Sequence, residues 1–301
     1  FNYLTKAASI HNAGPYSEKF DASAWKTVDL PHDWVVDLPF AGEASHSHGY
    51  KTVGYKYPET SVGWYRKTFT VPQEDFGKHI YLQFDGIFRD ARVWVNGFYL
   101  GSEPSGYATQ VYDITEYLNY GGENLVCVRA DATLEEGWFY EGAGIYRHVW
   151  LNKTAQVHVA PFGTFIHAGF PDTDTFDTAV LTIETTVKND GLKPADYALR
   201  HTLKDREGNV VATLTSDSAV TGLLPKESRT LCGTLTVSSP RLWSVDTPYI
   251  YNMCTEVYVG GKLEDSYDTP FGIRHIAFDP DRGFFLNGQH VQLKGVNMHQ
   301  D

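Results

Sequence analysis

The 301-residue sequence predicts an all-β protein made of two consecutive sandwiches. Segments in which apolar and polar residues alternate recur along the chain, as in WYRKTFTV and HIYLQFDGI. This period of two is typical of half-buried strands. Turn residues separate these segments, and no helical pattern exceeds two turns. Because the chain is longer than one ordinary sandwich, at least two domains are expected.

The first domain is expected over residues 1–156 as an antiparallel jelly-roll sandwich. ARVWVNGFYLG predicts a hairpin with Asn96–Gly97 at its tip, since this dipeptide tolerates the positive φ of a tight turn. Gly121–Gly122 predicts another turn. Residues 35–60 are irregular and rich in Gly, His and Tyr, and so long a loop in a compact domain is usually functional.

The stretch 134–151, LEEGWFYEGAGIYRHVWL, combines acidic, aromatic and small residues at the end of this domain. Such a combination suits a sugar, because aromatic rings cover its C–H face while carboxylates bind its hydroxyls. A buried aromatic loop that joins two strands is the alternative interpretation. Glu135 and Glu136 are neighbours in sequence, so they cannot be assumed to face each other across a sugar.

Residues 157–278 predict a second, immunoglobulin-like sandwich, with hairpins about every 20 residues. No chemical arrangement of acids, bases or aromatics gathers there, so this domain is expected to space and pack its neighbours. Residues 279–301 differ: after a hairpin at Asn287–Gly288, VQLKGVN resembles a buried parallel strand. Polar residues follow it at once, as at the start of a (β/α)8 barrel. The sequence thus predicts the first strand of a truncated TIM barrel.

The net charge of −12 argues against nucleic acid and anionic membrane surfaces as partners, and no apolar run approaches a membrane span. The chain opens on Phe1 without a leader. We therefore expect a processed or trimmed product, with a periplasmic or secreted location favoured over a cytoplasmic one.

Metal and disulfide chemistry are not expected in this chain. His46 and His48 lie close in sequence, but no third ligand has suitable spacing. Cys127 falls in a strand pattern and predicts a buried free thiol. Cys232 and Cys254 could meet across neighbouring strands, and free thiols are the favoured alternative.

Six motifs resemble glycoside hydrolase family 2, the β-galactosidase and β-glucuronidase family, in the order that this family uses. They are VGWYRKTFT (62–70), VWVNG (93–97), GYATQVYDITEYL (106–118), GAGIYRHVWL (142–151), FGIRH (271–275) and FFLNGQHVQLKGVNMH (284–299). The resemblance covers nearly the whole chain. It implies a galactose-binding-like jelly roll, an immunoglobulin-like domain and the start of a catalytic barrel. It also implies a retaining mechanism with two carboxylates on later barrel strands, beyond Asp301.

The resemblance suggests substrate contacts rather than catalytic residues for this chain. His299 matches the histidine that reaches the sugar in relatives, with a role in holding a barrel loop as the alternative, and Asp301 lies beside it. Relatives also send an acid into the site from the loop before GIYR. Trp138 stands in that place here, so the contact could come from Glu136, Glu141 or Trp138. We favour Glu141 together with Trp138.

The sequence thus favours the N-terminal part of a retaining β-glycosidase that acts on terminal β-linked sugars and is inactive without the rest of its barrel. A β-galactoside is the expected substrate on family frequency alone. A divalent or monovalent cation and a homo-oligomer are compatible with the intact enzyme. The alternatives are a stand-alone carbohydrate-binding protein and a surface adhesion module. The predicted C-terminal strand that ends in His299 favours the glycosidase over these alternatives, since a truncated barrel must begin with such a strand.

Overall fold

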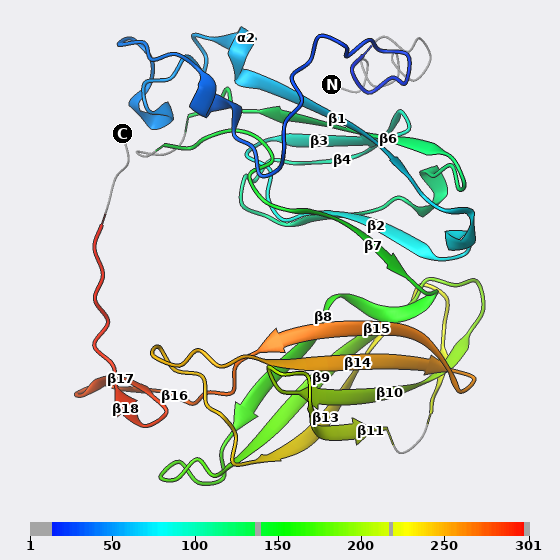
Figure 1. Ribbon diagram of the computed structural model, residues 1–301, viewed down its shortest axis with the longest axis vertical. Coiled ribbons are helices and arrows are strands. Elements are labelled where there is room, and N and C mark those ends of the chain that lie inside the picture. The colour runs from blue at the N-terminus through cyan, green and yellow to red at the C-terminus, as the bar shows by residue number, and fades with distance from the viewer. Residues whose placement is uncertain (1–13, 136–139, 217–218, 298–301) are drawn as a thin grey trace. The chain divides into compact units, whose positions relative to one another are not determined.

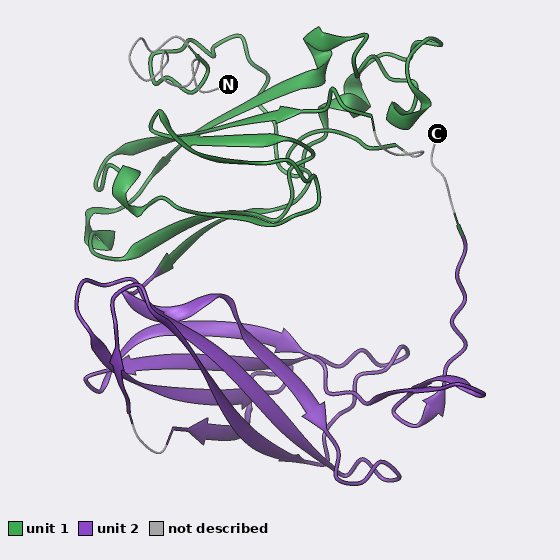
Figure 2. Ribbon diagram, turned by 180° about the vertical axis from the view of Figure 1, so that it is seen from behind, with its two compact units in different colours: residues 1–153, 297–301 green, residues 154–296 purple. Residues whose placement is uncertain are grey.

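A computed structural model describes residues 14–135, 140–216 and 219–297. The chain divides into two compact units (Figure 2). Unit 1 contains residues 1–153 together with 297–301, and unit 2 contains residues 154–296. The described chain is almost entirely β-structure (Figure 1), which confirms the predicted fold class.

Unit 1 is a sandwich of two antiparallel sheets (Figure 1). One sheet has the order β1 (Val62–Thr70), β6 (Glu123–Asp131), β3 (Ala91–Val95) and β4 (Phe98–Glu103). The other has the order β5 (Gln110–Asp113), β2 (His79–Phe84) and β7 (Val149–Thr154). Their inner faces share one core, in which Ile80 and Phe84 of β2 pack with Val93 and Val128 of the other sheet. In β2 and β3 the alternate residues Ile80, Leu82 and Phe84, and Ala91, Val93 and Val95, thus point into this common interior.

The predicted hairpin at Asn96–Gly97 is confirmed. Both residues have positive φ, 49° and 81°, between the paired strands β3 and β4. Gly121, with φ 76°, turns the chain into β6 in the same way. These residues fix where each strand ends, so the loops collect at the ends of the sandwich.

The segment before β1 forms short helical turns rather than strands. They are η1 (Trp34–Asp37), η2 (His46–His48) and α2 (Pro58–Ser61), and two further turns follow β1, η3 (Gln73–Asp75) and η4 (Thr115–Tyr117). Side-chain caps hold two of them. The Asp33 carboxylate accepts from Val35 N at 2.9 Å, and Ser45 Oγ accepts from Ser47 N at 3.2 Å. Such caps satisfy orphan N–H groups, so the loop has a defined shape.

Unit 2 contains a second sandwich. A five-stranded sheet has the order β11 (Val210–Thr215), β10 (Ala195–Lys204), β14 (Tyr251–Val259) and β15 (Lys262–Phe271), with β12 (Val220–Leu223) also paired to β10. The facing sheet has the order β13 (Ser228–Ser238), β9 (Thr178–Asn189) and β8 (Val157–Gly169). Leu181, Leu203 and Met253 lie fully buried in its core. This arrangement is the predicted immunoglobulin-like layer pair.

The C-terminal segment differs from its prediction in one respect. The hairpin at Asn287–Gly288 forms within the sheet of β16 (Ile276–Asp279), β17 (Gly283–Leu286) and β18 (Gln289–His290). Residues 291–297, however, adopt no strand, and Leu293 and Val296 are exposed. The Val291 amide donates to the Phe284 carbonyl oxygen at 2.9 Å. A parallel strand needs a ladder of such bonds, and none continues it over 292–297 within the described residues.

The cysteine predictions agree with the structure. Cys127 is buried, its Sγ lies 3.4 Å from the Pro15 carbonyl oxygen, and burial raises the pKa of this thiol to about 12. Cys232 and Cys254 are free thiols. Within the described residues no helix has the length and apolar character needed to cross a membrane.

Candidate functional site

Two loops that lie far apart in sequence meet at one end of the unit 1 sandwich. The amide of Glu141 donates to the carbonyl oxygen of Ser47 at 3.2 Å. Nearby, His48 Nε2 lies 3.2 Å from Glu141 Oε2, with side-chain exposures of 0% and 3%. The loop of residues 35–60 and the stretch 134–144 are therefore joined by a buried histidine–carboxylate contact.

Burial decides the charge state of His48. Loss of solvent lowers the pKa of this histidine, while the carboxylates of Glu141 and Glu135 oppose the shift. A neutral imidazole at neutral pH avoids burying a second charge beside Glu141. The pair thus fixes the two loops to each other without a full ion pair.

Asp33 belongs to the motif DLPHDW (29–34), which precedes η1, and its carboxylate holds the same stretch in place. Its carboxylate accepts from the Tyr140 hydroxyl at 2.7 Å and from the Ala143 amide at 3.0 Å, besides capping η1. Gly142 makes this possible: it has φ 68°, and a Cβ there would lie 2.6 Å from Asp33 Oδ2. The histidine of the motif is His32, and its Nδ1 lies 2.8 Å from the Tyr65 hydroxyl oxygen. The motif therefore positions the loop rather than offering a free histidine.

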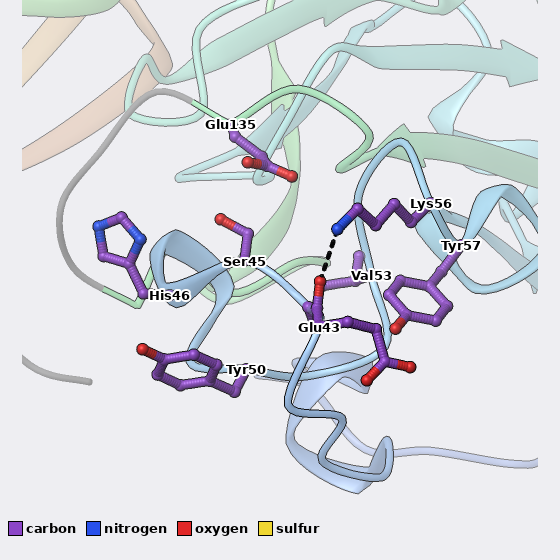
Figure 3. A pocket seen from close by; sticks show the side chains of 9 residues that line it. Glu43, Ser45, His46, Tyr50, Val53, Lys56, Tyr57 and Glu135 are labelled. Carbon is purple, nitrogen blue, oxygen red and sulfur yellow. Dashed lines mark hydrogen bonds between the residues drawn. The ribbon is translucent and has the colours of Figure 1, made fainter.

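A polar pocket opens over this joint (Figure 3). It encloses a cavity of about 260 Å³. Its lining residues are Glu43, Ala44, Ser45, His46, Tyr50, Val53, Lys56, Tyr57 and Glu135. All but one come from the loop before β1, and Glu135 comes from the start of the 134–144 stretch.

Charged groups dominate the pocket wall. Lys56 Nζ donates to the carbonyl oxygen of Glu43 at 2.8 Å (Figure 3). Desolvation and the neighbouring Glu43 carboxylate, to which the hydroxyl is hydrogen-bonded, raise the pKa of Tyr57. The Glu135 carboxylate lies over Gly54, where a Cβ would approach Oε1 to 2.7 Å. Because Gly54 has no side chain, the Glu135 carboxylate can lie this close to the backbone.

A larger groove of about 750 Å³ runs beside β1. Phe84, Val128 and Ile145 line part of it, and these residues also belong to the sandwich core. Most of its remaining lining residues come from the segment 22–38 and from β1, and they include polar side chains such as Asp37 and Arg66. The smaller pocket is the candidate for carbohydrate, because it lies where the two loops that were expected to be functional meet.

The sequence-predicted contact residues have different outcomes. Glu141 is described, and its carboxylate contacts buried His48 rather than open solvent, so its role in direct sugar contact stays a prediction. Trp138, His299 and Asp301 lie outside the described residues, as does Glu136. Among the described residues no group of three or more His, Cys, Asp or Glu side chains could hold a metal ion.

Sequence reasoning missed most of the pocket. Glu43, Lys56 and Tyr57 belong to the long irregular loop, which was expected to be functional without a named residue. Its length and its Gly, His and Tyr content were the available signal. Contacts with residues about 90 positions away, such as Ser47 with Glu141, leave no trace in local periodicity.

Two family models match most of the chain. The sugar binding domain of glycosyl hydrolases family 2 matches residues 22–155, and a second model of glycosyl hydrolases family 2 matches residues 158–274. The chain belongs to glycoside hydrolase family 2. The polar pocket therefore lies in the family 2 sugar-binding domain, and unit 2 contains the second matched domain.

Two of the family 2 relatives are named as a β-galactosidase and a β-glucuronidase. A β-galactosidase of Bacteroides ovatus is 38% identical over 94% of this chain, which spans 32% of that protein. A β-glucuronidase of Bacteroides fragilis is 30% identical over 92% of this chain, which spans 39% of that protein. The chain thus covers only about a third of the length of such relatives.

Solved family 2 structures share the fold. A glycosyl hydrolase family 2 member from Bacteroides cellulosilyticus superposes with a TM-score of 0.85 at 32% identity, covering 94% of this chain and 36% of that one. A calcium-binding mutant of Bacteroides uniformis β-glucuronidase 2 superposes with a TM-score of 0.75 at 29% identity, covering 94% of this chain and 33% of that one. Calcium binding is thus named for that structural neighbour.

Proposed function

We propose that this chain is the N-terminal, substrate-binding part of a retaining β-glycosidase that hydrolyses terminal β-linked galactosides. The observation that carries the proposal is the pair of family 2 matches over residues 22–155 and 158–274, in a chain that spans about a third of its relatives. The β-galactosidase of B. ovatus, at 38% identity, favours galactoside over glucuronide.

The catalytic carboxylates belong outside this chain. A retaining enzyme needs two carboxyl groups about 5–5.5 Å apart, one as nucleophile and one as acid/base. The family resemblance implies that both lie on later barrel strands, beyond Asp301, and we assign neither role to Glu135 or Glu141. His299, Asp301 and Trp138 remain proposed contacts to the sugar in the intact enzyme, in which a bound cation is also proposed.

The test is an assay of the full-length polypeptide beside the 301-residue chain. We expect the full-length protein to hydrolyse an aryl β-galactoside faster than the matching β-glucuronide, and to release the β-anomer first, as NMR would show. The 301-residue chain should be inactive on both substrates. A full-length protein without glycosidase activity would contradict the proposal, as would release of the α-anomer first.

A substitution tests the role of His299 separately. In the full-length enzyme His299→Ala should lower kcat/KM, because a hydroxyl contact strengthened in the transition state is lost. An unchanged kcat/KM would refute this role. We also propose a periplasmic or secreted location, which fractionation of the source cells tests, and assembly into a homo-oligomer, which light scattering of the full-length protein tests.

A further inference from the structure

We propose that the larger groove of unit 1 binds an aromatic carboxylate, whose rings lie on the apolar lining and whose acid group pairs with the ammonium group of Lys67. The groove is the cavity of about 750 Å³ between the segment 22–38 and strand β1, within the roughly 300–1,000 Å³ of pockets that enclose drug-sized ligands. The inference goes beyond the proposed function, because it needs neither a sugar nor bond cleavage. The groove shares no lining residue with the polar pocket.

The groove lies along an open side of the sandwich. Strand β1 is the outermost strand of one sheet, and β7 is the outermost strand of the other. Val126 and Val149 of the inner faces are only half-buried there, whereas Phe84 in the same groove is buried. The segment 22–38 forms no strand, and it leaves an accessible space between itself and the two edges. Apolar core surface therefore borders a cavity that a ligand can enter.

Aromatic rings form one wall of the groove, and hydrogen bonds hold them in place. The Tyr65 hydroxyl oxygen lies 2.8 Å from His32 Nδ1, and Trp34 Nε1 donates to the Thr60 carbonyl oxygen at 2.9 Å. Trp34 also lies against Gly63, where a Cβ would approach its ring to 2.5 Å. Because fixed rings pack well with another planar ring, this wall favours an aromatic ligand. A flexible chain would lose more conformational freedom on binding.

Lys67 supplies a positive charge at this groove. It is exposed, and it pairs with Val126 in the register of β1 and β6. Tyr65 and Val126 pack against the sandwich core, so Lys67 occupies an inward register position of the edge strand. An inward charge can simply guard an edge strand against pairing with another chain. Here the lysine also lines an apolar groove, where a ligand carboxylate would accept a charge-assisted hydrogen bond from it.

The other charged groups leave the groove positive. Lys26 Nζ and Asp37 Oδ2 form an exposed ion pair at 2.7 Å, so these charges offset each other locally. Arg66 donates to the carbonyl oxygens of Pro15 and Ser17, which are neutral acceptors, and its positive charge remains. The net charge of −12 repels an anion at long range, but salt screens this repulsion beyond about 8 Å under physiological conditions. The local cations thus favour a carboxylate over a neutral ligand.

The experiment is an amide NMR titration of the 301-residue chain with indole-3-acetate and with its neutral amide, indole-3-acetamide. We expect the carboxylate to bind with a Kd of about 1 mM, as the usual affinity per atom gives for a ligand of this size. It should bind about two- to fivefold more tightly than the amide, since an exposed ion pair contributes little more. Shift changes should centre on residues 25–38 and 63–67.

Substitutions test the assignment to Lys67. Lys67→Gln should bring the ratio of the two affinities close to one, and Lys67→Arg should preserve it. Lys19→Gln, which changes an exposed lysine of the same unit outside the groove, is the matched control and should leave the ratio unaltered. The affinity for the amide should be the same in all three variants, which shows that the groove itself stays intact.

A preference for the carboxylate that Lys67→Gln leaves unaltered would overturn the inference. Absence of binding by indole-3-acetate, or shift changes centred outside the groove, would overturn it too. Tighter binding of octanoate, a flexible chain with the same charge, would refute the aromatic class of the ligand. The outcome is independent of the glycosidase assay. A full-length protein without glycosidase activity would leave this site standing, and a chain that binds no aromatic carboxylate would leave the proposed function standing.

Discussion

Each unit of this chain buries one histidine against one carboxylate, but the two pairs differ in what surrounds them. In unit 1, His48 Nε2 lies 3.2 Å from Glu141, and the pair joins two irregular loops. In unit 2, His158 Nε2 lies 3.7 Å from Asp190, whose carboxylate also contacts Lys188 at 3.0 Å and Lys226 at 3.3 Å. The second carboxylate therefore contacts two lysines, whereas the cation that acts on the first pair is the guanidinium of Arg89, which contributes to the lowered pKa of His48.

The surroundings of the two pairs indicate different roles for them. Asp190 follows β9 and faces β8, so its cations strengthen contacts that the sheet already makes. Glu141 lies between loops, next to a pocket lined by Glu43, Lys56 and Glu135. A buried histidine–carboxylate pair thus stabilises a sandwich in unit 2 and joins two irregular loops beside the polar pocket in unit 1.

The largest expected effect is in unit 2. Asp190→Ala should lower the free energy of unfolding by about 3 kcal/mol, because a buried charge network loses its shared partner. Urea unfolding measures the loss, and hydrogen exchange locates it. Asp190→Asn, which keeps the shape, is the control and should cost less. A loss below about 1 kcal/mol for the alanine variant would contradict this account of the network.

Acid should destabilise unit 2 by about 2 kcal/mol between pH 7 and pH 5. Burial lowers the pKa of His201 to about 4, below the value near 6.5 of an unfolded chain. The unfolded state therefore binds more protons in this window, so stability falls as the pH drops below 6.5 toward 4. Hydrogen exchange of unit 2 across this range measures the slope.

His201→Gln provides the control, because it removes the titrating group while it can still bond Thr185 Oγ1, which lies 2.9 Å from His201 Nε2. The variant should reduce the slope in unit 2 and leave the part that comes from buried His158, whose pKa is also lowered by burial. The lowered pKa of His48 predicts a slope of the same sign in unit 1, which this variant should leave intact. A slope unchanged in unit 2 would refute the assignment.

Two glycine substitutions distinguish the cost of backbone strain alone from the cost of strain together with a steric clash. Gly54→Ala should destabilise unit 1 by about 2 kcal/mol, because φ is 104° and the new Cβ would meet the Glu135 carboxylate. Gly222→Ala in unit 2 has φ 69° and open space around it, so it should cost only about 1 kcal/mol. Thermal unfolding gives both values. Equal losses would mean that Glu135 yields freely, and the pocket would not be preformed.

The smallest effect on stability is expected at the loop joint. Glu141→Gln should cost about 1 kcal/mol, since an amide can still bond His48 while the charge is lost. The same variant should weaken binding of methyl β-galactopyranoside, because the pocket above shifts. Asp190→Asn should leave that binding unchanged. Equal effects of the two variants on sugar binding would remove the distinction between site and scaffold.

The sheets could be predicted from sequence because their signals are local. Strand β1 forms over the residues whose sequence alternates, and the turns at Asn96 and Asn287 adopt the positive φ that their type favours. The strand expected at 291–297 did not form, since strand formation depends on partners that alternation cannot supply. Local pattern thus predicts which residues can form strands and not which strands are paired.

The candidate site could be predicted only in outline. The loop 35–60 and the 134–144 stretch were each expected to be functional, but their contact depends on three-dimensional closure over long sequence distances. The expected sugar contact of Glu141 shows the limit: a carboxylate next to aromatics suits a sugar and suits a buried histidine equally well. Only the position of His48, fully buried beside it, separates the two interpretations.

Amide NMR mapping of the 301-residue chain during titration with methyl β-galactopyranoside tests the central claim most directly. The account predicts that shift changes concentrate at residues 43–57 and at Glu135, with the residues of unit 2 unaffected. Changes centred in unit 2, or spread evenly over both units, would contradict the assignment of sugar binding to the polar pocket.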